Sequence, residues 1–462
     1  MTNIQELKRY KNIYMIGIGG ISMSGIAEIL KNEGFNISGS DITSSEVTDK
    51  LIKNGIPVTI GHNLPALKNA DLVVYSAAIK QDDVELVKAK ELGIPIIERA
   101  DFLGEITKGY RNTICVSGTH GKSTTTSMVS MCFLEAHKDP TIQIGAALDN
   151  IGGNYKVGNS DYFILEACEY VESFLKFYPK AEIILNIDND HLDYYGSIDN
   201  IKNAFIKYVK LLPDDGILVY NADDKNCSHL SQYTKAKSLT FGINSTNANF
   251  VAKNIIFDKN GFPSFDVYYN NTFYKTMKLS IPGKHNILNA LSCIALCNEF
   301  GLDRNDIKNA LLKYKGAHRR FEYIGEFNGV RVFDDYGHHP TEIKAVAEAL
   351  KKKQYNHSWI VFQPHTYSRT KNLLNEFAEC LTEFDNIIVT DIYAARESNT
   401  YGVSSKDIVE KIDSMGRTAY YIPNFDDIVD FLKRNAKPDD IVLTQGAGTI
   451  TQIGPKLVNN DK

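Results

Sequence analysis

Residues 117–126 read Ser-Gly-Thr-His-Gly-Lys-Ser-Thr-Thr-Thr, and this stretch decides the fold of the region around it. It follows a short apolar run, Thr113–Val116, and opens a segment whose apolar residues recur with helical spacing. Strand, glycine turn, lysine, hydroxyl and helix in this order are typical of a loop that binds the phosphates of a nucleoside triphosphate. Two residues rather than four separate the glycines, so an ordinary glycine turn is the alternative interpretation.

Each residue type in this loop suits a phosphate ligand. Gly118 and Gly121 let backbone N–H groups approach phosphate oxygens, and the N-terminus of the following helix adds partial positive charge. Lys122 is placed to reach the outer phosphates, and the hydroxyl of Ser123 is placed to hold Mg²⁺. We therefore predict an ATP site that comprises Gly118, Thr119, His120, Gly121, Lys122, Ser123 and Thr124.

Composition limits the class of protein. At 462 residues the chain is too long for one ordinary core, so about three domains are expected. Hydrophobic residues make up 43% of the chain and charged residues 23%, which is typical of a soluble globular protein. The net charge is −5 and no basic block stands out, which argues against nucleic-acid binding. Because the net charge is negative, an anionic substrate would need a local cluster of positive charges at its binding site.

The seven cysteines and the lengths of the apolar runs indicate the cellular compartment in which the protein is expected. No Cys-x-x-Cys pair occurs, and Cys293 and Cys297 lie one helical turn apart, which indicates packing on a helix face rather than a metal or redox site. No signal peptide is recognised, and no apolar run approaches the roughly 18 residues that a membrane span needs. We therefore predict a reduced, cytoplasmic protein without a membrane segment.

Residues 12–41 predict one strand–turn–helix–strand unit. The turn Gly17-Ile-Gly-Gly-Ile-Ser22 is a dinucleotide fingerprint in which Ser22 replaces the third glycine. Asp41 follows about 20 residues later, where a carboxylate binds a ribose hydroxyl. The expected elements are strands at Ile13–Ile18, Phe35–Ser38, Asp71–Ser76 and Pro95–Ile97, with a helix at Met23–Lys31. This pattern predicts a small Rossmann-like domain over residues 1–108, although many folds use such a turn only for packing.

In the remaining chain, strands and helices alternate in two further regions, which we place at residues 109–315 and 316–462. In the central region strands are expected at Thr113–Val116, Tyr162–Leu165, Ile183–Ile187, Gly216–Tyr220 and Lys237–Phe241. A period of two over residues 248–279 predicts a small antiparallel insertion, followed by a helix over His285–Phe300. In the last region strands are expected at Val330–Asp334, Trp359–Gln363, Ile387–Asp391, Ala419–Ile422 and Ile441–Thr444. The fold class is therefore α/β in three domains: Rossmann-like, P-loop-type mononucleotide-binding, and Rossmann-like again.

Two nucleotide-type turns in one chain narrow the possible functions. A dehydrogenase needs the first turn but has no use for a phosphate loop. A simple ATPase needs the phosphate loop but not the first turn. An enzyme that binds a nucleotide-linked substrate and also cleaves ATP needs both.

A carboxylate and an imidazole follow strands downstream of the phosphate loop. Glu166 ends one expected strand, and His191 follows the end of another. Since ligands in open α/β sheets collect at the carboxyl ends of strands, these groups are predicted to meet Ser123 around Mg²⁺. The alternative interpretation is a pair of solvated loop residues.

Two clusters in the last region combine His, Tyr and Arg. Asp334–Glu342 joins a strand end to a helix that is expected to begin at Pro340, and Gln363–Thr370 follows the next strand. These clusters supply donors for carboxylate and phosphate oxygens, and Arg369 is the best candidate for a forked contact. The segment Gly316–Phe321 at the domain junction adds further cations, unless it is only a charged linker.

Taken together, these motifs resemble the Mur ligases of peptidoglycan synthesis along nearly the whole chain, and within them the alanine-adding branch. The segments that carry the resemblance are Gly17–Ala27, Ser117–Thr126, Gly283–Ala290, Arg319–Phe321, Asp334–Glu342 and Gln363–Thr370. The shortened glycine spacing matches the form of the loop in these ligases. Ser117 and Ser123 stand where the family commonly has Thr, and the segment Glu166-Ala-Cys-Glu-Tyr departs from the family pattern, which leaves the role of Glu169 open.

The resemblance implies a reaction. ATP would phosphorylate the lactyl carboxylate of UDP-N-acetylmuramate, and the amine of L-alanine would attack the resulting acyl phosphate, with release of ADP and phosphate. The implied cofactors are ATP and Mg²⁺, and the implied substrates are UDP-N-acetylmuramate and L-alanine. No nucleic acid, no membrane and a monomer or weak homodimer are expected.

The resemblance also implies roles for single residues. Lys122, His191, His338 and Arg369 would be catalytic, and Ser123, Glu166 and His191 would hold metal. His285, Asn289 and Arg320 would join the ATP site. The UDP-sugar site would comprise Gly19, Gly20, Ser22, Asp41, Ser76 and Arg99, and the alanine site Tyr336, His338, His365 and Arg369.

Three other functions compete with this interpretation. A murein tripeptide ligase, which recycles cell-wall peptide onto UDP-N-acetylmuramate, shares the phosphate loop but differs in the segment at Gln363–Thr370. A non-catalytic protein on a decayed ligase scaffold is disfavoured because Lys122, Glu166 and His191 are intact. A nicotinamide dehydrogenase rests on the first glycine turn alone and leaves the other two regions unexplained.

Overall fold

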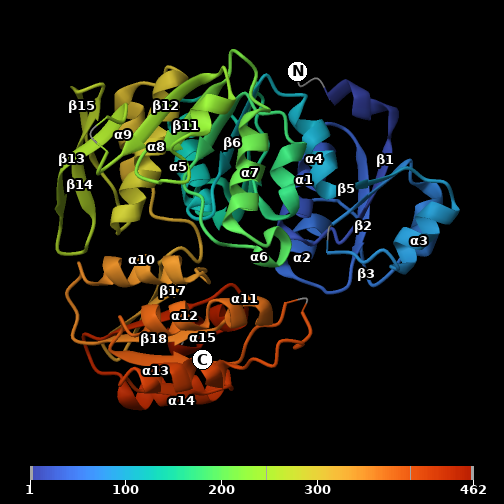
Figure 1. Cartoon of the computed structure of the whole chain (residues 1–462). Coiled ribbons are helices and arrows are strands. Elements are labelled where there is room, and N and C mark those ends of the chain that lie inside the picture. Colours follow the sequence, from blue (N-terminus) through green and yellow to red (C-terminus); the bar gives the residue numbers. More distant parts are fainter. Residues whose placement is uncertain (1–3, 77, 246, 396, 459–462) are drawn as a thin grey trace. The chain divides into compact units, whose positions relative to one another are not determined.

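Three α/β sheets follow one another along the chain (Figure 1). The structure is a computed structural model and describes residues 4–76, 78–245, 247–395 and 397–458. The chain divides into two compact units: Met1–Ile187, Asp199–Val251 and Ala290–Ala310 form the first, and Asp188–Ile198, Ala252–Asn289 and Leu311–Lys462 form the second. The predicted α/β class is confirmed, whereas the boundaries after residues 108 and 315 stay predictions.

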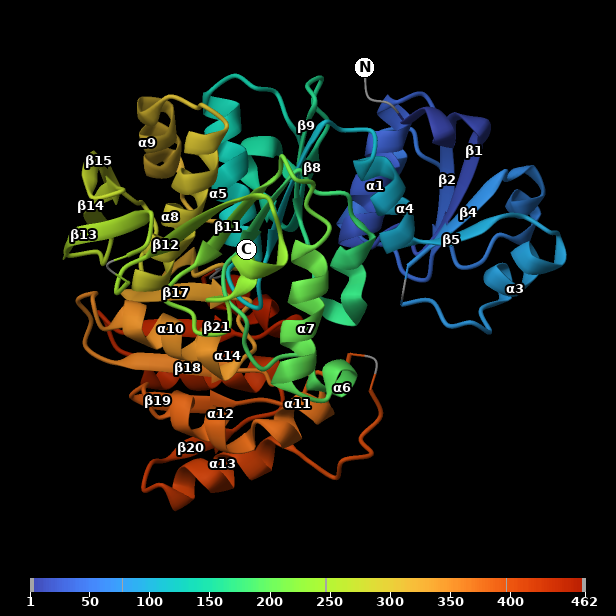
Figure 2. The ribbon, with the colours of Figure 1, turned by 45° about the horizontal axis from the view of Figure 1, so that its top comes forward.

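The first sheet is parallel throughout, with the strand order β3-β2-β1-β4-β5. Its elements are η1 (Ile4–Arg9), β1 (Asn12–Ile16), α1 (Ile21–Asn32), β2 (Asn36–Asp41), α2 (Glu46–Lys53), β3 (Val58–Ile60), η2 (Leu64–Asn69), β4 (Leu72–Tyr75), α3 (Val84–Glu91), β5 (Ile96–Glu98) and α4 (Arg99–Thr107). Figure 2 shows α1 and α4 on one side of this sheet and α3 on the other. The strand order reverses between β1 and β4, and ligands of doubly wound sheets bind at such a switch point.

The second sheet has the order β15-β14-β13-β12-β11-β10-β6-β9-β7-β8. The pairs from β13 through β12, β11, β10, β6 and β9 to β7 are parallel, whereas β14–β15 and β7–β8 are antiparallel. Its strands are β6 (Asn112–Ser117), β7 (Thr141–Leu148), β8 (Gly153–Lys156), β9 (Tyr162–Glu166), β10 (Ala181–Ile184), β11 (Ile217–Asn221), β12 (Lys237–Gly242), β13 (Phe250–Phe257), β14 (Pro263–Tyr269) and β15 (Thr272–Lys278).

The helices of this part of the chain are α5 (Lys122–Glu135), η3 (Asp149–Ile151), η4 (Tyr170–Lys176), α6 (Leu192–Tyr195), α7 (Ile198–Val209), η5 (Leu230–Tyr233), α8 (Lys284–Glu299) and α9 (Arg304–Lys313). The sequence predicts a helix after the phosphate loop, and α5 begins at the lysine of that loop. The antiparallel β14–β15 hairpin confirms the insertion that the period of two predicts.

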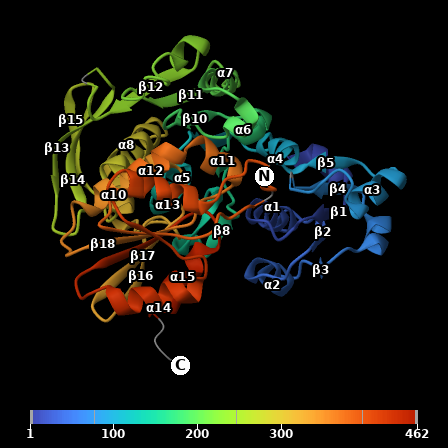
Figure 3. The ribbon, with the colours of Figure 1, turned by 60° about the horizontal axis from the view of Figure 1, so that its bottom comes forward.

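The third sheet has the order β16-β17-β21-β18-β19-β20, and only β16 runs antiparallel to its neighbour. Its elements are β16 (Glu322–Phe327), β17 (Val330–Asp335), α10 (Pro340–Leu350), β18 (Ser358–Phe362), α11 (Tyr367–Asn372), α12 (Leu374–Leu381), β19 (Asn386–Val389), α13 (Ser405–Ser414), β20 (Ala419–Tyr421), α14 (Phe425–Asn435), β21 (Ile441–Gln445), η6 (Thr449–Gln452) and α15 (Ile453–Val458). Two apolar cores form, one under α10, α12 and α13 and the other under α14 and α15. Figure 3 shows these two helix sets on opposite faces of the sheet.

The sequence did not predict four of the described strands, namely β3, β7, β8 and β16. β3 and β8 are short edge strands without a buried residue or a continuous apolar run. β16 is an edge strand that carries two glutamates and Gly325, so its apolar alternation is weak. Among the described residues no helix is both long and apolar enough to cross a membrane.

A carboxylic acid lies in the core beneath the phosphate loop. Glu182 on β10 stands in register with Cys115 on β6 and is fully buried. Among the described residues neither of its carboxyl oxygens has a hydrogen-bond partner. Burial raises the pKa of Glu182 well above its usual range, so this side chain is neutral in the folded protein.

We expect Glu182→Gln to stabilise the protein increasingly as pH rises. The unfolded chain ionises Glu182 above pH of about 4.3 while the folded chain keeps the proton, so the wild-type protein loses up to about 1.4 kcal/mol of stability per pH unit between the two pKa values. The free energy of unfolding in urea, measured at pH 5 and pH 8, should therefore favour the variant more at pH 8. Glu91→Gln on exposed α3 is the control and should show no such trend; an equal trend would contradict the prediction.

Candidate active site

The phosphate loop requires glycine at two positions. Gly118 has φ +135° and Gly121 has φ +87°, both in the region that favours glycine. A Cβ atom on Gly118 would also lie 3.1 Å from the backbone nitrogens of Leu185 and Asn186. The turn therefore follows from the glycine positions, and Lys122 begins α5 directly after it.

Asn186, which sequence reasoning did not single out, fixes the loop from the neighbouring strand end. Its side-chain oxygen accepts from the backbone N–H of His120 at 2.8 Å, and its amide donates to the carbonyl of His120 at 3.0 Å. The backbone N–H of Thr119 donates to the carbonyl of Asn186 at 3.1 Å. Its place after β10, at the same sheet edge as the loop, is the one signal that could have indicated this role.

The amine of Lys122 is held by the loop and by one carboxylate. Its Nζ donates to the carbonyls of Gly118 at 2.6 Å and Thr119 at 3.0 Å, and lies 3.0 Å from an oxygen of Glu169. Burial by itself lowers the pKa of Lys122, but the carboxylates of Glu169 and Glu166 raise it above its usual value. Lys122 is therefore a charged amine in a buried setting, and Glu169, whose role the sequence left open, is its partner.

Ser123 and Glu166 form the predicted oxygen pair beside this amine. The Ser123 hydroxyl donates to Glu166 Oε2 at 2.8 Å, and the same oxygen accepts from the backbone N–H of Gly145 at 2.8 Å. A Cβ atom on Gly145 would lie 2.7 Å from this oxygen, so the carboxylate needs glycine there. A hydroxyl and a carboxylate are hard oxygen donors, so the pair fits Mg²⁺. Thr124 is buried in the first turn of α5 beside them.

The residues predicted for the UDP-sugar site meet at the switch point of the first sheet. The backbone N–H of Gly19 donates to Asp41 Oδ2 at 2.9 Å, and Gly20 N–H donates to the Gly17 carbonyl. A Cβ atom on Gly17 would lie 3.6 Å from Cβ of Ser76, which follows β4. The structure therefore brings the glycine turn, the acidic residue and the β4 end to one edge.

Ser22 links this edge to further side chains. Its Oγ accepts from Arg99 Nη1 at 3.3 Å and from the amide of Gln143 at 2.9 Å. Gln143 lies on β7, in a strand that the sequence did not predict, and was not among the candidate residues. Both contacts lie within the first compact unit.

A second set of charged groups lies within the other compact unit. Arg369 donates through Nη2 and Nε to one oxygen of Asp190, at 2.8 and 3.3 Å, and through Nη1 to His365 Nδ1 at 2.9 Å. An arginine only donates, so His365 Nδ1 carries no proton. Burial by itself raises the pKa of Asp190, but the Arg369 guanidinium, with His191 and His338, holds it well below its usual range. Asp190 was not among the candidate residues.

Two imidazoles of this set, those of His338 and His365, are neutral near pH 7. Burial lowers the pKa of His338 to about 3, and burial with the Arg369 guanidinium lowers that of His365 to about 4. The two rings lie 5.4 Å apart, and the Tyr336 ring lies 5.6 Å from His338. His338 Nδ1 donates to the Tyr336 carbonyl at 3.2 Å, which leaves the lone pair on Nε2.

Two arginines and a buried carboxyl support the same cluster. The guanidinium groups of Arg319 and Arg320 lie 5.0 and 5.1 Å from the centre of the Tyr336 ring. Asp335 accepts from the backbone N–H groups of Phe321 and Gly337, at 2.9 and 2.7 Å. Asp335 was missed as a positioning residue, although it stands at the end of β17 where the sequence placed the cluster.

The remaining candidate residues belong to the second unit. His191 has φ +53°, and its backbone N–H donates to Asp190 at 2.7 Å. On α8 the amide of Asn289 donates to Asn286 at 3.0 Å, and burial lowers the pKa of His285 to about 4. The phosphate loop belongs to the first unit, so the metal set that includes His191 and the ATP set that includes His285, Asn289 and Arg320 stay predictions.

Three protein-family models match the chain in series. They are described as "Mur ligase family, catalytic domain" over residues 12–111, "Mur ligase middle domain" over 116–297 and "Mur ligase, glutamate ligase domain" over 319–448. These matches cover the three sheets in turn and confirm the three-domain class of the fold.

Known proteins are similar along the whole chain. The UDP-N-acetylmuramate–L-alanine ligase of Acetivibrio thermocellus is 50% identical over 458 residues, which cover 99% of this chain and 98% of that protein. The crystal structure of the UDP-N-acetylmuramate–alanine ligase of Thermotoga maritima has a TM-score of 0.83 at 30% identity and covers 97% and 98% of the two chains. A murein peptide ligase from Psychrobacter arcticus has a TM-score of 0.72 at 24% identity, with 98% and 100% covered, and shows the shared fold alone.

We expect His338 and His365 to stay neutral from pH 8 down to pH 5, because their pKa values lie near 3 and 4. Proton binding to these rings is then confined to lower pH, and stability is lost as pH falls below the usual histidine value of about 6.5. NMR of the protein labelled with ¹⁵N-histidine checks this, with His338→Gln and His365→Gln to assign the two signals. A titration of the His338 or His365 signals between pH 8 and pH 5 would contradict the prediction.

Proposed function

This chain belongs to the Mur ligase family and is an ATP-dependent ligase, and from this premise we propose how its residues join L-alanine to the lactyl carboxylate of UDP-N-acetylmuramate. The observation that carries the choice of substrates is the 50% identity to an alanine ligase over 99% of the chain. The location that we propose is the cytoplasm, where ATP is available. A monomer or weak homodimer stays a prediction.

Two chemical steps are needed because a carboxylate is a poor acyl donor. In the first step an oxygen of the lactyl carboxylate attacks the γ-phosphorus of ATP, the bond from that phosphorus to the bridging oxygen breaks, and ADP leaves. In the second step the alanine amine attacks the carbonyl carbon, the C–N bond forms, and the C–O bond to phosphate breaks. The amine loses a proton, and the products are an amide and inorganic phosphate.

Lys122 is proposed to stabilise the charge that develops on the transferring phosphoryl group. Its amine is charged and lies against two loop carbonyls and the Glu169 carboxylate. Phosphate oxygens can take over the position of that carboxylate without a large movement of the amine. This pre-set position supports the role, since donors that need no reorganisation contribute most to catalysis.

Ser123 and Glu166 are proposed to hold Mg²⁺. The two oxygens already lie 2.8 Å apart, and both are hard donors. The bound ion would neutralise charge on the outer phosphates. His191 is the proposed third member of the metal set.

Gly19, Gly20, Ser22 and Asp41, with Ser76 and Arg99, are proposed to bind the UDP-sugar at the switch point of the first sheet. The cluster in the second unit is proposed to hold alanine and the acyl group. There the lone pair on His338 Nε2 can accept a hydrogen bond from the amine, and Arg369 can hold a carboxylate or the developing oxyanion.

The proposed function is tested by ADP release from the purified full chain with UDP-N-acetylmuramate and single amino acids. Release that depends on L-alanine is the expected result. Release that requires a tripeptide instead would identify the murein tripeptide ligase, and release that ignores every amino acid would contradict a ligase of this kind.

We expect Lys122→Ala to lower the rate of ADP release by at least about 100-fold, as for the loss of a single group that stabilises transition-state charge. Binding of UDP-N-acetylmuramate to the full chain should stay unchanged in calorimetry, because that site is proposed on the first sheet. The matched control is Lys138→Ala, an exposed lysine beyond the end of α5. Equal loss of UDP-sugar binding would show that the two sites are not separate.

We expect Glu166→Gln to raise the Mg²⁺ concentration for half-maximal ADP release by at least about tenfold, because a charged ligand is lost. A titration of activity with Mg²⁺ at fixed substrates measures the change. Glu105→Gln, which removes only a surface ion pair, is the control. An unchanged Mg²⁺ requirement would remove Glu166 from the metal set.

A further inference from the structure

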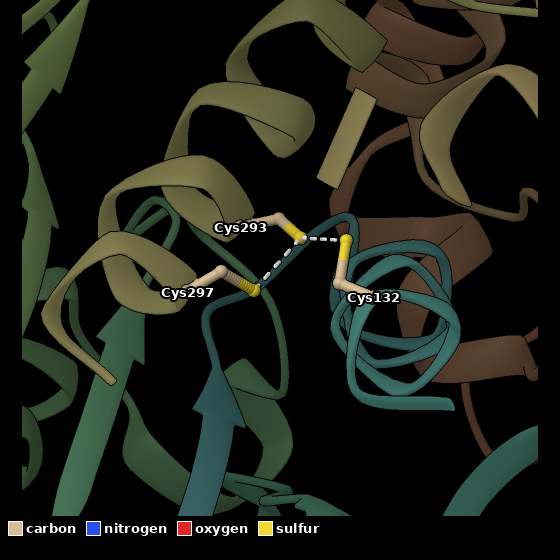
Figure 4. Close-up of side chains that lie close together, drawn as sticks. All are labelled: Cys132, Cys293 and Cys297. Atoms are coloured by element: carbon tan, nitrogen blue, oxygen red, sulfur yellow. Dashed lines mark hydrogen bonds between the residues drawn. The ribbon is translucent and has the colours of Figure 1, made fainter. Parts of the chain in front are cut away.

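Three cysteines from two helices meet in the core of the first compact unit (Figure 4). Cys132 lies on α5, and Cys293 and Cys297 lie one turn apart on α8. The Sγ atoms of Cys132 and Cys293 are 3.6 Å apart, and those of Cys293 and Cys297 are 3.9 Å apart. All three sulfurs lie within 4.8 Å of one another, and none of the three residues is exposed.

Two of the three distances between these sulfurs match those of ligands that share one central atom. With a metal–sulfur bond of about 2.3 Å, two thiolates on one tetrahedral centre lie about 3.8 Å apart. The observed 3.6 and 3.9 Å bracket this value. Packing of cysteines as small apolar residues requires only that each fills its own space, and it does not require three sulfurs to converge.

The number of ligands and the charge select the kind of ion. Structural zinc takes four protein ligands, and the group in the described chain has three. A divalent ion with three thiolates would leave a buried negative charge, and the carboxylates of Glu135 and Asp306 already disfavour negative charge on Cys132. A trivalent ion with three thiolates is neutral, so it suits a buried apolar site.

We propose that Cys132, Cys293 and Cys297 form a binding site for a trivalent thiophilic element, of which arsenic(III) is the representative. Each thiol gives its proton to one hydroxyl of As(OH)₃, three As–S bonds form, three As–O bonds break, and three water molecules leave. Arsenic stays trivalent and no electron is transferred. None of the three cysteines is among the residues proposed for ATP, UDP-sugar or alanine, although α5 also carries Lys122 and α8 also carries Asn289.

The three thiols differ in how readily they lose a proton. The S–H groups of Cys293 and Cys297 lower the pKa of the Cys132 thiol, whereas burial raises the pKa of both partners. Cys132 therefore forms the first bond most readily. Because all three side chains are buried, entry requires local opening of α5 from α8, and binding is expected to be slow.

The test uses the full chain with Cys168→Ser, which removes the exposed thiol. After long incubation with arsenite, we expect the intact mass to rise by one arsenic atom less three hydrogens. Arsenic X-ray absorption should show three sulfur neighbours. Cys293→Ala and Cys297→Ser in the same background should each bind arsenite at least tenfold more weakly, and Cys115→Ala, buried on β6, should bind like the parent.

Two different cluster variants, Cys293→Ala and Cys297→Ser, are used in case one of them fails to fold. The urea midpoint of each variant is compared with that of the parent to show that it is folded. The proposal is overturned if the folded parent binds no arsenic, or if Cys293→Ala and Cys297→Ser bind as tightly as the parent. Fewer than three sulfur neighbours would also overturn it. Tighter binding of Cd²⁺ than of arsenite would overturn the choice of a trivalent ion.

Discussion

The ion pair of the charged, largely buried amine of Lys122 with Glu169, at the start of α5, is the interaction on which the phosphate site depends. A buried ammonium needs compensation, and two loop carbonyls and Glu169 supply it. The carbonyls point at the amine only because Gly118 and Gly121 adopt positive φ. The glycine turn, the lysine and the carboxylate are therefore interdependent. The turn places the carbonyls against the amine, and the carboxylate compensates the charge of that amine.

The second compact unit also compensates a buried cation with a carboxylate, but with different residues. Arg369 is paired with Asp190 much as Lys122 is paired with Glu169. Each cation is held by a carboxylate at a place where the proposed reaction brings an anionic group. Buried ion pairs contribute little net stability, but they keep a cation in one position. The neutral imidazoles beside Arg369 follow from the same burial, because desolvation disfavours a second positive charge there more than the neighbouring carboxylates favour it.

Most elements with a clear apolar pattern were predictable from the sequence, including the three-residue strands β5 and β20, although the eight-residue β7 was missed. α10 begins at Pro340 as predicted, and α5 follows the phosphate loop as predicted, since a proline in the first helical turn and a phosphate loop are strong local signals. β3 and β16 were missed, because both are edge strands in which polar residues or glycine interrupt the apolar pattern. Cys132 shows the same limit, since it stands 161 residues from Cys293 and no local pattern links them.

The sequence by itself determined which chemical groups are present and which local turns carry them. The phosphate loop, the Gly17–Ser22 turn and the two His-rich clusters were recognisable because their backbone geometry depends on adjacent residues. Only the tertiary structure decided the partners: Glu169 for Lys122, Asn186 for the loop, and Asp190 for Arg369. The physical reason is that charge compensation in a core depends on distance in space, and parallel strands bring together residues that lie far apart along the chain.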